Sequence, residues 1–399
     1  TPRERGPTRA NSGALLLSHT ASVIILNYKS AADLPACLGG LLTQTFQDFE
    51  ILLVDQGNKD GSTQAVMATF EGPFQERLKV LWAGRNLGFA GGCNLAFEAA
   101  QGKWVALLNA DTVPSPAWLE ALIKGANSAP NIGMCASRIQ LLTNPGQIDN
   151  LGHRLYPDGL NIPIARGERD GPQFDEPEEV LCPSGAAGRY LMEAVREVGG
   201  FDDSFFAYGE DLDLGLSLRA LGYTCLYCPE ARVRHALSAT WGRRSLRKAF
   251  YVERNRTYVA LRHFPPWAIA SLPALTFRRH RLTLAQGLGG RGPLASVGEA
   301  WEESATQSVP GARGRLGGIG MRVGALTRIA LAGGAAMAGQ VAGVLGAPNQ
   351  LKARSELQAR GAVGAENYVD LLKRFGAKAE DAAVQWLDGP MQGTESDDT

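Results

Sequence analysis

The sequence has 399 residues, of which 45% are hydrophobic, and its 40 basic and 40 acidic residues give a formal net charge of zero. This composition excludes a disordered chain, and the length is sufficient for more than one folded module. The six cysteines lack the spacing of a disulfide framework, which argues against a small secreted scaffold and favours a reducing compartment. We therefore expect a cytoplasmic protein, and leave open whether it attaches to the inner face of the plasma membrane.

The N-terminal segment, residues 1–20, has no signal-peptide pattern and is expected to be a lead-in to the first module. Among the uncharged runs, the nearest to a membrane-spanning helix is 329–346. Alanine and glycine dominate this run and would contribute little transfer free energy. The sequence therefore predicts no transmembrane helix.

Four short apolar runs, rich in valine, isoleucine and leucine, come next. They cover 22–28, 49–55, 78–82 and 104–109. Runs of this kind are typical of strands buried on both faces, and the segments between them have leucine and alanine at helical spacing. The alternation predicts an α/β fold for the first 112 residues, with a mainly parallel sheet and right-handed crossovers.

Polar side chains follow each of these runs. They are Asn27 and Tyr28 after the first, Asp55 at the end of the second, Arg85 and Asn86 after the third, and Asn109 and Asp111 after the fourth. Turns at strand ends also favour asparagine and aspartate. Because four polar tips would meet at one edge of a parallel sheet, where ligands bind, we favour a binding site over turn chemistry alone.

Residues 114–264 show a mixed pattern, with a proline-, glycine- and acid-rich loop at 156–179. We expect an antiparallel extension of the sheet and one helix that begins near Glu210. The C-x-x-C of Cys225 and Cys228 lies in a predicted strand without a second cysteine pair at ligand spacing. This favours a structural role for the two cysteines over zinc or redox chemistry.

The composition changes to alanine, glycine and arginine after Pro265, which predicts a separate, mostly helical C-terminal region at 265–399 with a disordered end at 394–399. Its first segment carries Trp267 and Phe277 and is followed by three arginines. This pattern fits a helix that lies on a membrane surface. It fits equally well a helix packed on the first module or on another subunit, and both readings stay open.

Residues around the third strand have the chemistry to hold a nucleotide. The carboxylate of Asp55 can accept a hydrogen bond from a pyrimidine ring or a ribose hydroxyl, and Arg85 can stack on a base or pair with phosphate. Gly88 and its neighbouring glycines allow a close approach of backbone to ligand before the helix that continues from Asn94. The segment contains no G-x-G-x-x-G motif, which argues against a dinucleotide site.

Acidic residues form two further candidate groups. Asp111, with Asn109 two residues before it, offers oxygen ligands for a divalent cation that bridges a diphosphate. Glu210, Asp211 and Asp213 crowd one helix start. The helix macrodipole favours acids there, but three carboxyl groups repel one another beyond what capping needs, which fits a general base.

Basic residues dominate 232–291, which contains thirteen lysines and arginines against the single acid Glu253. This imbalance favours a polyanionic partner: a nucleotide diphosphate, a lipid pyrophosphate or an anionic membrane. His235 follows a predicted strand in this segment and is either a packed histidine or a further metal ligand.

The order and spacing of the motifs are more specific than any one of them. The motifs are VIILNYKS, ILLVDQGNKDGS, RNLGFAGGCNLAF, LLNADT, SGAAGRYLM, GGFDDSFFAYGEDLDLGLSLRALGY, and VRH followed by RN. Together they resemble the family-2 inverting glycosyltransferases with the GT-A fold, and within them the rhamnosyltransferase-like branch. The resemblance covers about 21–264. It implies a nucleotide-diphospho-sugar transferase fold with a nucleotide-binding half at 21–112 and an acceptor half at 113–264.

The resemblance also implies roles for single residues. Asp211, beside Glu210, would be the catalytic base, and Asp111 with His235 would bind Mg2+ or Mn2+. The residues implied in nucleotide-sugar binding are Asn27, Tyr28, Asp55, Arg85, Asn86, Gly88, Asn94, Asn109 and Asp111. The sequence departs from the family pattern at Asn109, which replaces the first acid of the D-x-D motif, and at Gln56 and Gly57 in the second loop.

The implied reaction moves a sugar from a dTDP-rhamnose or UDP-hexose donor to a cell-envelope glycan or a lipid-linked saccharide. Loops such as 143–161 would recognise the donor hydroxyls. An anionic membrane surface and a homo-oligomer stay open as partners, and no nucleic acid is expected. A sugar-phosphate nucleotidylyltransferase would need a glycine-rich basic loop after the first strand, which LNYKSAADL does not provide. A non-catalytic nucleotide-binding scaffold at the membrane surface is the second alternative.

Overall fold

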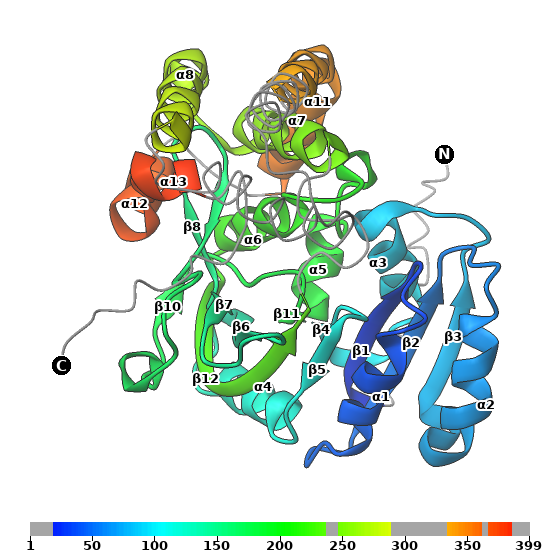
Figure 1. Cartoon of the computed structure of the whole chain (residues 1–399). Helices are drawn as coiled ribbons and strands as arrows, with labels where there is room; N and C mark the ends of the chain where they lie inside the picture. Colours follow the sequence, from blue (N-terminus) through cyan, green and yellow to red (C-terminus); the bar gives the residue numbers. More distant parts are fainter. Residues whose placement is uncertain (1–18, 237–245, 289–332, 361–365, 385–399) are drawn as a thin grey trace, which may run out of the picture.

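The structure, a computed structural model, describes residues 19–236, 246–288, 333–360 and 366–384. Its first part alternates strands and helices. In chain order these are β1 (His19–Asn27), α1 (Leu34–Leu42), β2 (Phe49–Asp55), α2 (Ser62–Phe74), β3 (Leu78–Trp82), α3 (Gly88–Ala99) and β4 (Gly102–Leu107). The four predicted strands are confirmed, with β1 and β4 starting a few residues earlier than their apolar runs. β1 pairs in parallel with both β2 and β4, and β3 pairs in parallel with β2 (Figure 1).

The second part extends the sheet on the other side of β4. Its elements are β5 (Thr112–Pro114), α4 (Trp118–Ala126), β6 (Ile132–Leu141), β7 (Ile148–Asn150), β8 (His153–Leu155), β9 (Asn161–Pro163), β10 (Glu179–Val180), β11 (Gly188–Leu191), α5 (Met192–Val198), α6 (Glu210–Ala220) and β12 (Thr224–His235). The main path of the sheet runs β10-β12-β6-β11-β4-β1-β2-β3. Cys225 and Cys228 are buried on β12 and unbridged.

The predicted antiparallel extension with one helix is only partly correct. β11 is antiparallel to both β4 and β6, but β12 runs parallel to β6. The helix that begins at Glu210 is confirmed, yet α4 and α5 precede it. The signal for α4 was present in the sequence, because Trp118, Leu119, Leu122 and Ile123 recur at helical spacing and are all buried.

Two layers of core packing hold the sheet, one on each face. In β1, Val23 and Ile25 belong to the cluster that contains residues of α1 and α2, whereas Ile24 belongs to the cluster that contains residues of α3. This alternation is the period of two expected for a strand covered by helices on both faces. Loops that carry polar groups therefore emerge at the ends of the strands.

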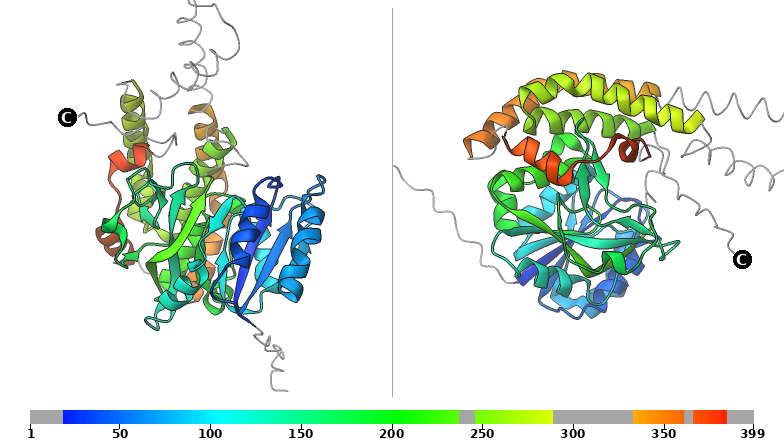
Figure 2. Two further views of the ribbon diagram at one scale, coloured as in Figure 1. Left: turned by 60° about the horizontal axis from the view of Figure 1, so that its bottom comes forward. Right: turned by 90° about the vertical axis from the view of Figure 1, so that its left-hand side faces the viewer.

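The C-terminal part is helical. It contains α7 (Leu246–His263), α8 (Pro266–Leu288), a helix at 333–345, α11 (Ala347–Ala359), α12 (Glu366–Phe375) and α13 (Ala379–Val384). Figure 2 shows α8 and the orange helical segment as an outer layer over α7. None of the helices in the described ranges is long and apolar enough to span a membrane.

The break at Pro265 separates α7 from α8, as the change in composition suggested. α8 nevertheless packs on the first module, because Arg279 is fully buried and pairs with Asp158 at 2.8 Å and with Glu253 at 2.7 Å. The division of the chain into domains at 264 stays a prediction. Most of the expected N-terminal lead-in and the expected disordered end at 394–399 lie outside the described residues.

Candidate active site

The carboxyl ends of β1, β2, β3 and β4 bring the predicted polar tips to one edge of the sheet. Asn27 and Asp55 are register partners, and their side chains turn inward toward α2. The Asn27 amide is fully buried and donates to Oγ of Ser62 at 3.1 Å and to Oγ1 of Thr63 at 2.8 Å. Direct contact of the Asn27 side chain with a nucleotide therefore does not fit this conformation, in which it holds the start of α2.

Asp55 organises its own loop. Its side chain is almost fully buried, and Oδ1 accepts hydrogen bonds from the amides of Gly57 at 2.8 Å and Asn58 at 3.0 Å. Its Oδ2 accepts from Thr63. These contacts fix the loop beside the binding edge, and a direct contact between Asp55 and a base or ribose stays a prediction.

Gln56 and Gly57 join the second loop to the third. Oε1 of Gln56 accepts a hydrogen bond from the amide of Leu87 at 2.8 Å. Gly57 has φ +76°, and a Cβ there would lie 2.9 Å from the Cα of Arg85. Gln56 and Gly57, which depart from the family pattern, thus make contacts between the two loops. Arg85 is exposed and Tyr28 is partly exposed at the same edge, where a ligand can reach them.

Gly88 lets the loop before α6 approach the start of α3. It has φ +76°, and a Cβ there would lie 2.4 Å from the carbonyl oxygen of Phe206. That oxygen accepts hydrogen bonds from the amides of Phe89 at 2.6 Å and Ala90 at 3.2 Å. The first amides of α3 are therefore occupied by this loop, and the contact of Gly88 with a nucleotide sugar stays a prediction.

Replacing Gly88 by alanine is expected to lower the free energy of unfolding by about 3 kcal/mol, because the new Cβ adds a clash with Phe206 to the cost of a positive φ. Gly84 is a matched control, since it has φ +71° and no atom within 4 Å of an added Cβ. Gly84→Ala should cost only about 1 kcal/mol. Equal losses in urea unfolding would contradict the assigned close approach.

Asn86 and Asn94 make contacts within the protein. Oδ1 of Asn86 accepts from the amide of Gly88 at 2.8 Å. Nδ2 of Asn94 donates to the carbonyl of Phe201 at 2.8 Å and to Asp203 at 2.7 Å, and its Oδ1 accepts from the amide of Phe201 at 2.9 Å. Asn94 therefore holds the turn before α6, and its predicted contact with the ligand stays a prediction.

Asp111 and His235 meet as the sequence suggested. Nε2 of His235 lies 3.4 Å from Oδ1 of Asp111, and its Nδ1 lies 2.8 Å from Oδ2 of Asp149. Burial lowers the pKa of His235, but the hydrogen bonds and charges of Asp111 and Asp149 outweigh it and raise the pKa to about 10. Arg166 pairs with Asp149 at 2.9 Å from its other side. The imidazole is thus held between two carboxylates.

This pair fits a divalent cation that would replace the proton on Nε2 of His235 and take its other ligands from a diphosphate. Asp111 and His235 are each slightly exposed, at 12% and 10% of the side chain. Asp149 contacts the far nitrogen of the ring, and within the described ranges no three histidine, cysteine, aspartate or glutamate side chains converge on one metal position. Two protein ligands suffice for a cation such as Mg2+ that is shared with substrate phosphates. The side chain of Asn109 is partly exposed beside them.

Asp211 lies in the first turn of α6 with both carboxylate oxygens oriented. Oδ1 accepts from Nδ2 of Asn161 at 3.2 Å, and Oδ2 accepts from the amide of Gly185 at 3.2 Å. Nδ1 of His153 lies 3.8 Å from Oδ2. The carboxylate is therefore fixed by groups from three different segments, as a general base must be.

Glu210 has a different environment. It is buried, its Oε2 has no hydrogen-bond partner within the described structure, and burial together with the nearby Asp211 raises its pKa well above the usual value for glutamate. Burial and the neighbouring negative charge thus favour the neutral form of this carboxyl group. Of the two predicted catalytic acids, Asp211 is the one with the geometry of a base.

The cation pair and the base meet at the loop between β10 and β11. The amide of Asn109 donates to the carbonyl of Ala186 at 2.8 Å, and the amide of Gly185 donates to Asp211. Neighbouring residues of one loop thus contact the base and the backbone of Asn109, two residues before Asp111. The arrangement can hold a diphosphate on one side and deprotonate a hydroxyl on the other.

Comparison with known proteins identifies the family. Residues 22–198 match the family model described as "Glycosyl transferase family 2". The matched segment, which is somewhat less than half of the chain, has the sequence pattern of this family. The glycosyltransferase is 28% identical over 251 residues to the N-acetylglucosaminyl-diphospho-decaprenol L-rhamnosyltransferase of Mycobacterium tuberculosis, which covers 55% of this chain and 77% of that protein. It is 30% identical over 211 residues to the pre-mycofactocin glycosyltransferase of the same organism, covering 53% of this chain and 42% of that protein.

A solved structure supports the GT-A-type fold of the glycosyltransferase. The crystal structure of GalNAc-T7 with UDP, GalNAc and Mn2+ aligns with a TM-score of 0.51 and 17% identity, covering 62% of this chain and 49% of that chain. This likeness concerns the fold alone. With the family match, it confirms the expected class: a mainly parallel central sheet flanked by helices, followed by a helical C-terminal region.

Sequence reasoning missed several side chains of the glycosyltransferase site. Asp149 and His153 lie on β7 and β8, and Asn150 joins them because its Nδ2 lies 3.1 Å from Nε2 of His153. The segment from β7 to β8 connects His235 to Asp211. The only signal was a run of polar residues in the 143–161 loop, which had been expected to contact the donor.

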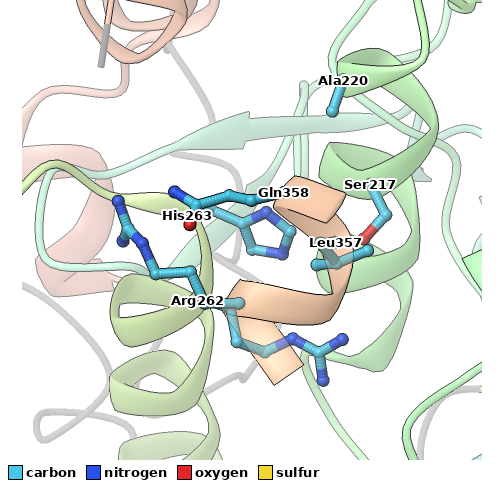
Figure 3. A pocket seen from close by; sticks show the side chains of 7 residues that line it. Ser217, Ala220, Arg262, His263, Leu357 and Gln358 are labelled. Carbon is cyan, nitrogen blue, oxygen red and sulfur yellow. The ribbon is translucent and has the colours of Figure 1, made fainter. Parts of the chain in front are cut away.

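Asp213, the third acid at the start of α6, anchors that helix. It contacts Nε2 of His263 at 2.8 Å and Nε of Arg262 at 2.9 Å, both from α7. Arg262 and His263 also line a small pocket between α6, α7 and α11, shown in Figure 3. The pocket's residues from α6, Ser217 and Ala220, lie on later turns of the helix than Asp211. We assign no catalytic role to it.

Proposed function

We propose that this glycosyltransferase moves a sugar, with inversion, from a nucleotide-diphosphate donor to a hydroxyl of a cell-envelope glycan or lipid-linked saccharide. The observation that carries the proposal is that neighbouring residues of one loop contact Asp211 and the backbone of Asn109, two residues before Asp111. Asp111 and His235 would hold Mg2+ or Mn2+, which would supply charge neutralisation for the departing diphosphate.

Asp211 acts as the general base. Its oriented carboxylate accepts the proton of the acceptor hydroxyl while that oxygen attacks the anomeric carbon from the face opposite the diphosphate. One displacement inverts the configuration. Asn161 and Gly185 hold the carboxylate in place through its two oxygens. Because an ordinary carboxylate is a weak base for an alcohol, orientation contributes more than basicity.

The donor that we favour is dTDP-rhamnose, with a UDP-hexose as the alternative. The name of the Mycobacterium tuberculosis relative supports a rhamnosyl donor and a lipid-linked acceptor. The presence of UDP and Mn2+ in the GalNAc-T7 structure supports a nucleotide diphosphate and a divalent metal. A thermal-shift titration with dTDP, UDP and GDP, each with Mn2+, Mg2+ or EDTA, tests this choice. Stabilisation by one nucleotide only in the presence of metal is expected, and stabilisation that EDTA leaves unchanged would refute the metal role.

Asp149 is expected to orient His235 for metal binding, because it fixes the hydrogen bond at Nδ1 and leaves Nε2 to face Asp111. Asp149→Asn should weaken Mn2+ binding, measured by calorimetry in the presence of the nucleotide, by about 10- to 100-fold. Asp370→Asn, at an exposed carboxylate of α12, is the control and should bind Mn2+ like the wild type. Wild-type affinity in Asp149→Asn would show that the ring needs no such support.

A further inference from the structure

The outer surface of α8 carries a stripe of large apolar side chains. Trp267 is 58% exposed, Phe277 is 68% exposed and Leu284 is 48% exposed. Their spacing of ten and seven residues places them on one side of the helix. Arg278 and Arg281 are exposed on the same side. The stripe is therefore apolar with basic residues set among the apolar ones.

The neighbouring helix at 333–345 also carries exposed apolar residues, without basic ones. Its exposed apolar residues are Met337, Val341, Val344 and Leu345. Its opposite side is made of small residues and lies on α7, because a Cβ on Gly339 would meet the carbonyl of Phe250 at 2.3 Å and one on Gly343 would meet Thr257 at 2.8 Å. The apolar side thus faces away from α7. We call these four residues and the five residues named on α8 the docking face.

Acidic residues are missing from the sequence around the docking face. No aspartate or glutamate occurs at 254–298 or at 304–355. Glu253, just before the first of these stretches, is fully buried and pairs with Arg279 and Arg256. The charge of the face is therefore positive, which complements an anionic surface.

The inner side of α8 ties the docking face to the catalytic half. Arg279 pairs with Asp158, which lies three residues before Asn161, and Asn161 donates to the carboxylate of Asp211. The outer layer is consequently fixed to the loop that orients the proposed base. Figure 2 shows this layer on the outside of the molecule, over α7.

We propose that the docking face binds the surface of an anionic phospholipid bilayer, with its apolar side chains in the interfacial region and Arg278 and Arg281 near the headgroups. Aromatic and aliphatic side chains mixed with basic ones, on helices too polar to span, are the pattern of interfacial binding. An anionic bilayer repels acidic side chains, whereas an interface with another protein or with a second copy has no need to exclude them. The inference of membrane binding rests on the docking face alone. Its consequence, that a lipid-linked acceptor would be presented to Asp211 at the membrane, rests on the proposed function. The inner face of the plasma membrane would be its location.

The test is cosedimentation of the full chain with vesicles of phosphatidylcholine, alone or mixed with phosphatidylglycerol. We expect binding to the mixed vesicles only. The apolar variant, Trp267→Ser with Phe277→Ser, and the basic variant, Arg278→Glu with Arg281→Glu, should each bind about tenfold more weakly or worse.

Matched controls lie elsewhere on the surface. Trp82 is 59% exposed at the end of β3, so Trp82→Ser should leave vesicle binding unchanged. Lys103→Glu with Lys124→Glu, at exposed sites on β4 and α4, controls for net charge. Wild-type binding by both docking-face variants, or no binding of the wild type to anionic vesicles, would overturn the proposal. The proposal would also be overturned if the wild type formed a dimer but bound no vesicles, and the apolar variant were a monomer. Nucleotide stabilisation, measured in parallel, reports on the proposed function separately.

Discussion

Replacing Asp211 by asparagine is expected to lower kcat for sugar transfer by about a thousandfold, within the range that general base catalysis contributes. The amide keeps the size of the side chain, and its single oxygen can accept a hydrogen bond from Asn161 or from Gly185 but not from both. It cannot accept the proton of the acceptor hydroxyl. The metal-dependent binding of the nucleotide, which the variant leaves intact, should stay close to that of the wild type.

Asp203→Asn is the control for this variant, because Asp203 is an exposed carboxylate in the loop before α6 and contacts Asn94. Its transfer rate should stay within a few-fold of the wild type. If Asp211→Asn retained full transfer while Glu210→Gln abolished it, the base would be Glu210 and not Asp211.

Arg279→Met is expected to lower the free energy of unfolding by about 3 to 5 kcal/mol, the usual cost of removing one partner from a buried ionic cluster. Arg279 is fully buried between Asp158 and Glu253, and its loss would leave excess negative charge in the interior. Burial favours the neutral form of Glu253, and chiefly Arg279 and Arg256 hold its pKa well below the usual value. The unfolding can be measured in urea.

The adjacent Arg278 provides a matched control, since it is exposed on the same helix. Arg278→Met should change the free energy of unfolding by no more than about 0.5 kcal/mol. Equal effects of the two substitutions would show that α8 is held on the first module by its apolar contacts and not by the cluster around Arg279.

The strands of the first half were predictable because each is a short, continuous apolar run buried on both faces, as in 49–55. The second half was harder. β10 and β11 have two and four residues, too short for an apolar pattern to stand out. The parallel pairing of β12 with β6 joins segments about ninety residues apart and depends on the whole sheet.

The position of a candidate site residue was predictable where its motif follows a strand end or begins a helix. Asp111 and Asp211 lie where the motifs indicated. The roles of Asn27 and Asn94 were not predictable, because the same residue types serve a ligand contact or a buried hydrogen bond, and only the fold decides between them. The contact of Asp149 with His235 spans 86 residues and has no local signal.

The central claim is that this chain transfers a sugar from a nucleotide-diphosphate donor to a hydroxyl, with Asp211 as the base. The most direct test is incubation of the full chain and metal with labelled dTDP-rhamnose or UDP-hexoses and a polyprenyl-diphosphate-linked N-acetylglucosamine acceptor. NMR then gives the anomeric configuration of the product. The account predicts a lipid-linked disaccharide of inverted configuration that EDTA abolishes and Asp211→Asn reduces. A product with retained configuration, or nucleotide binding without transfer to any acceptor, would contradict it.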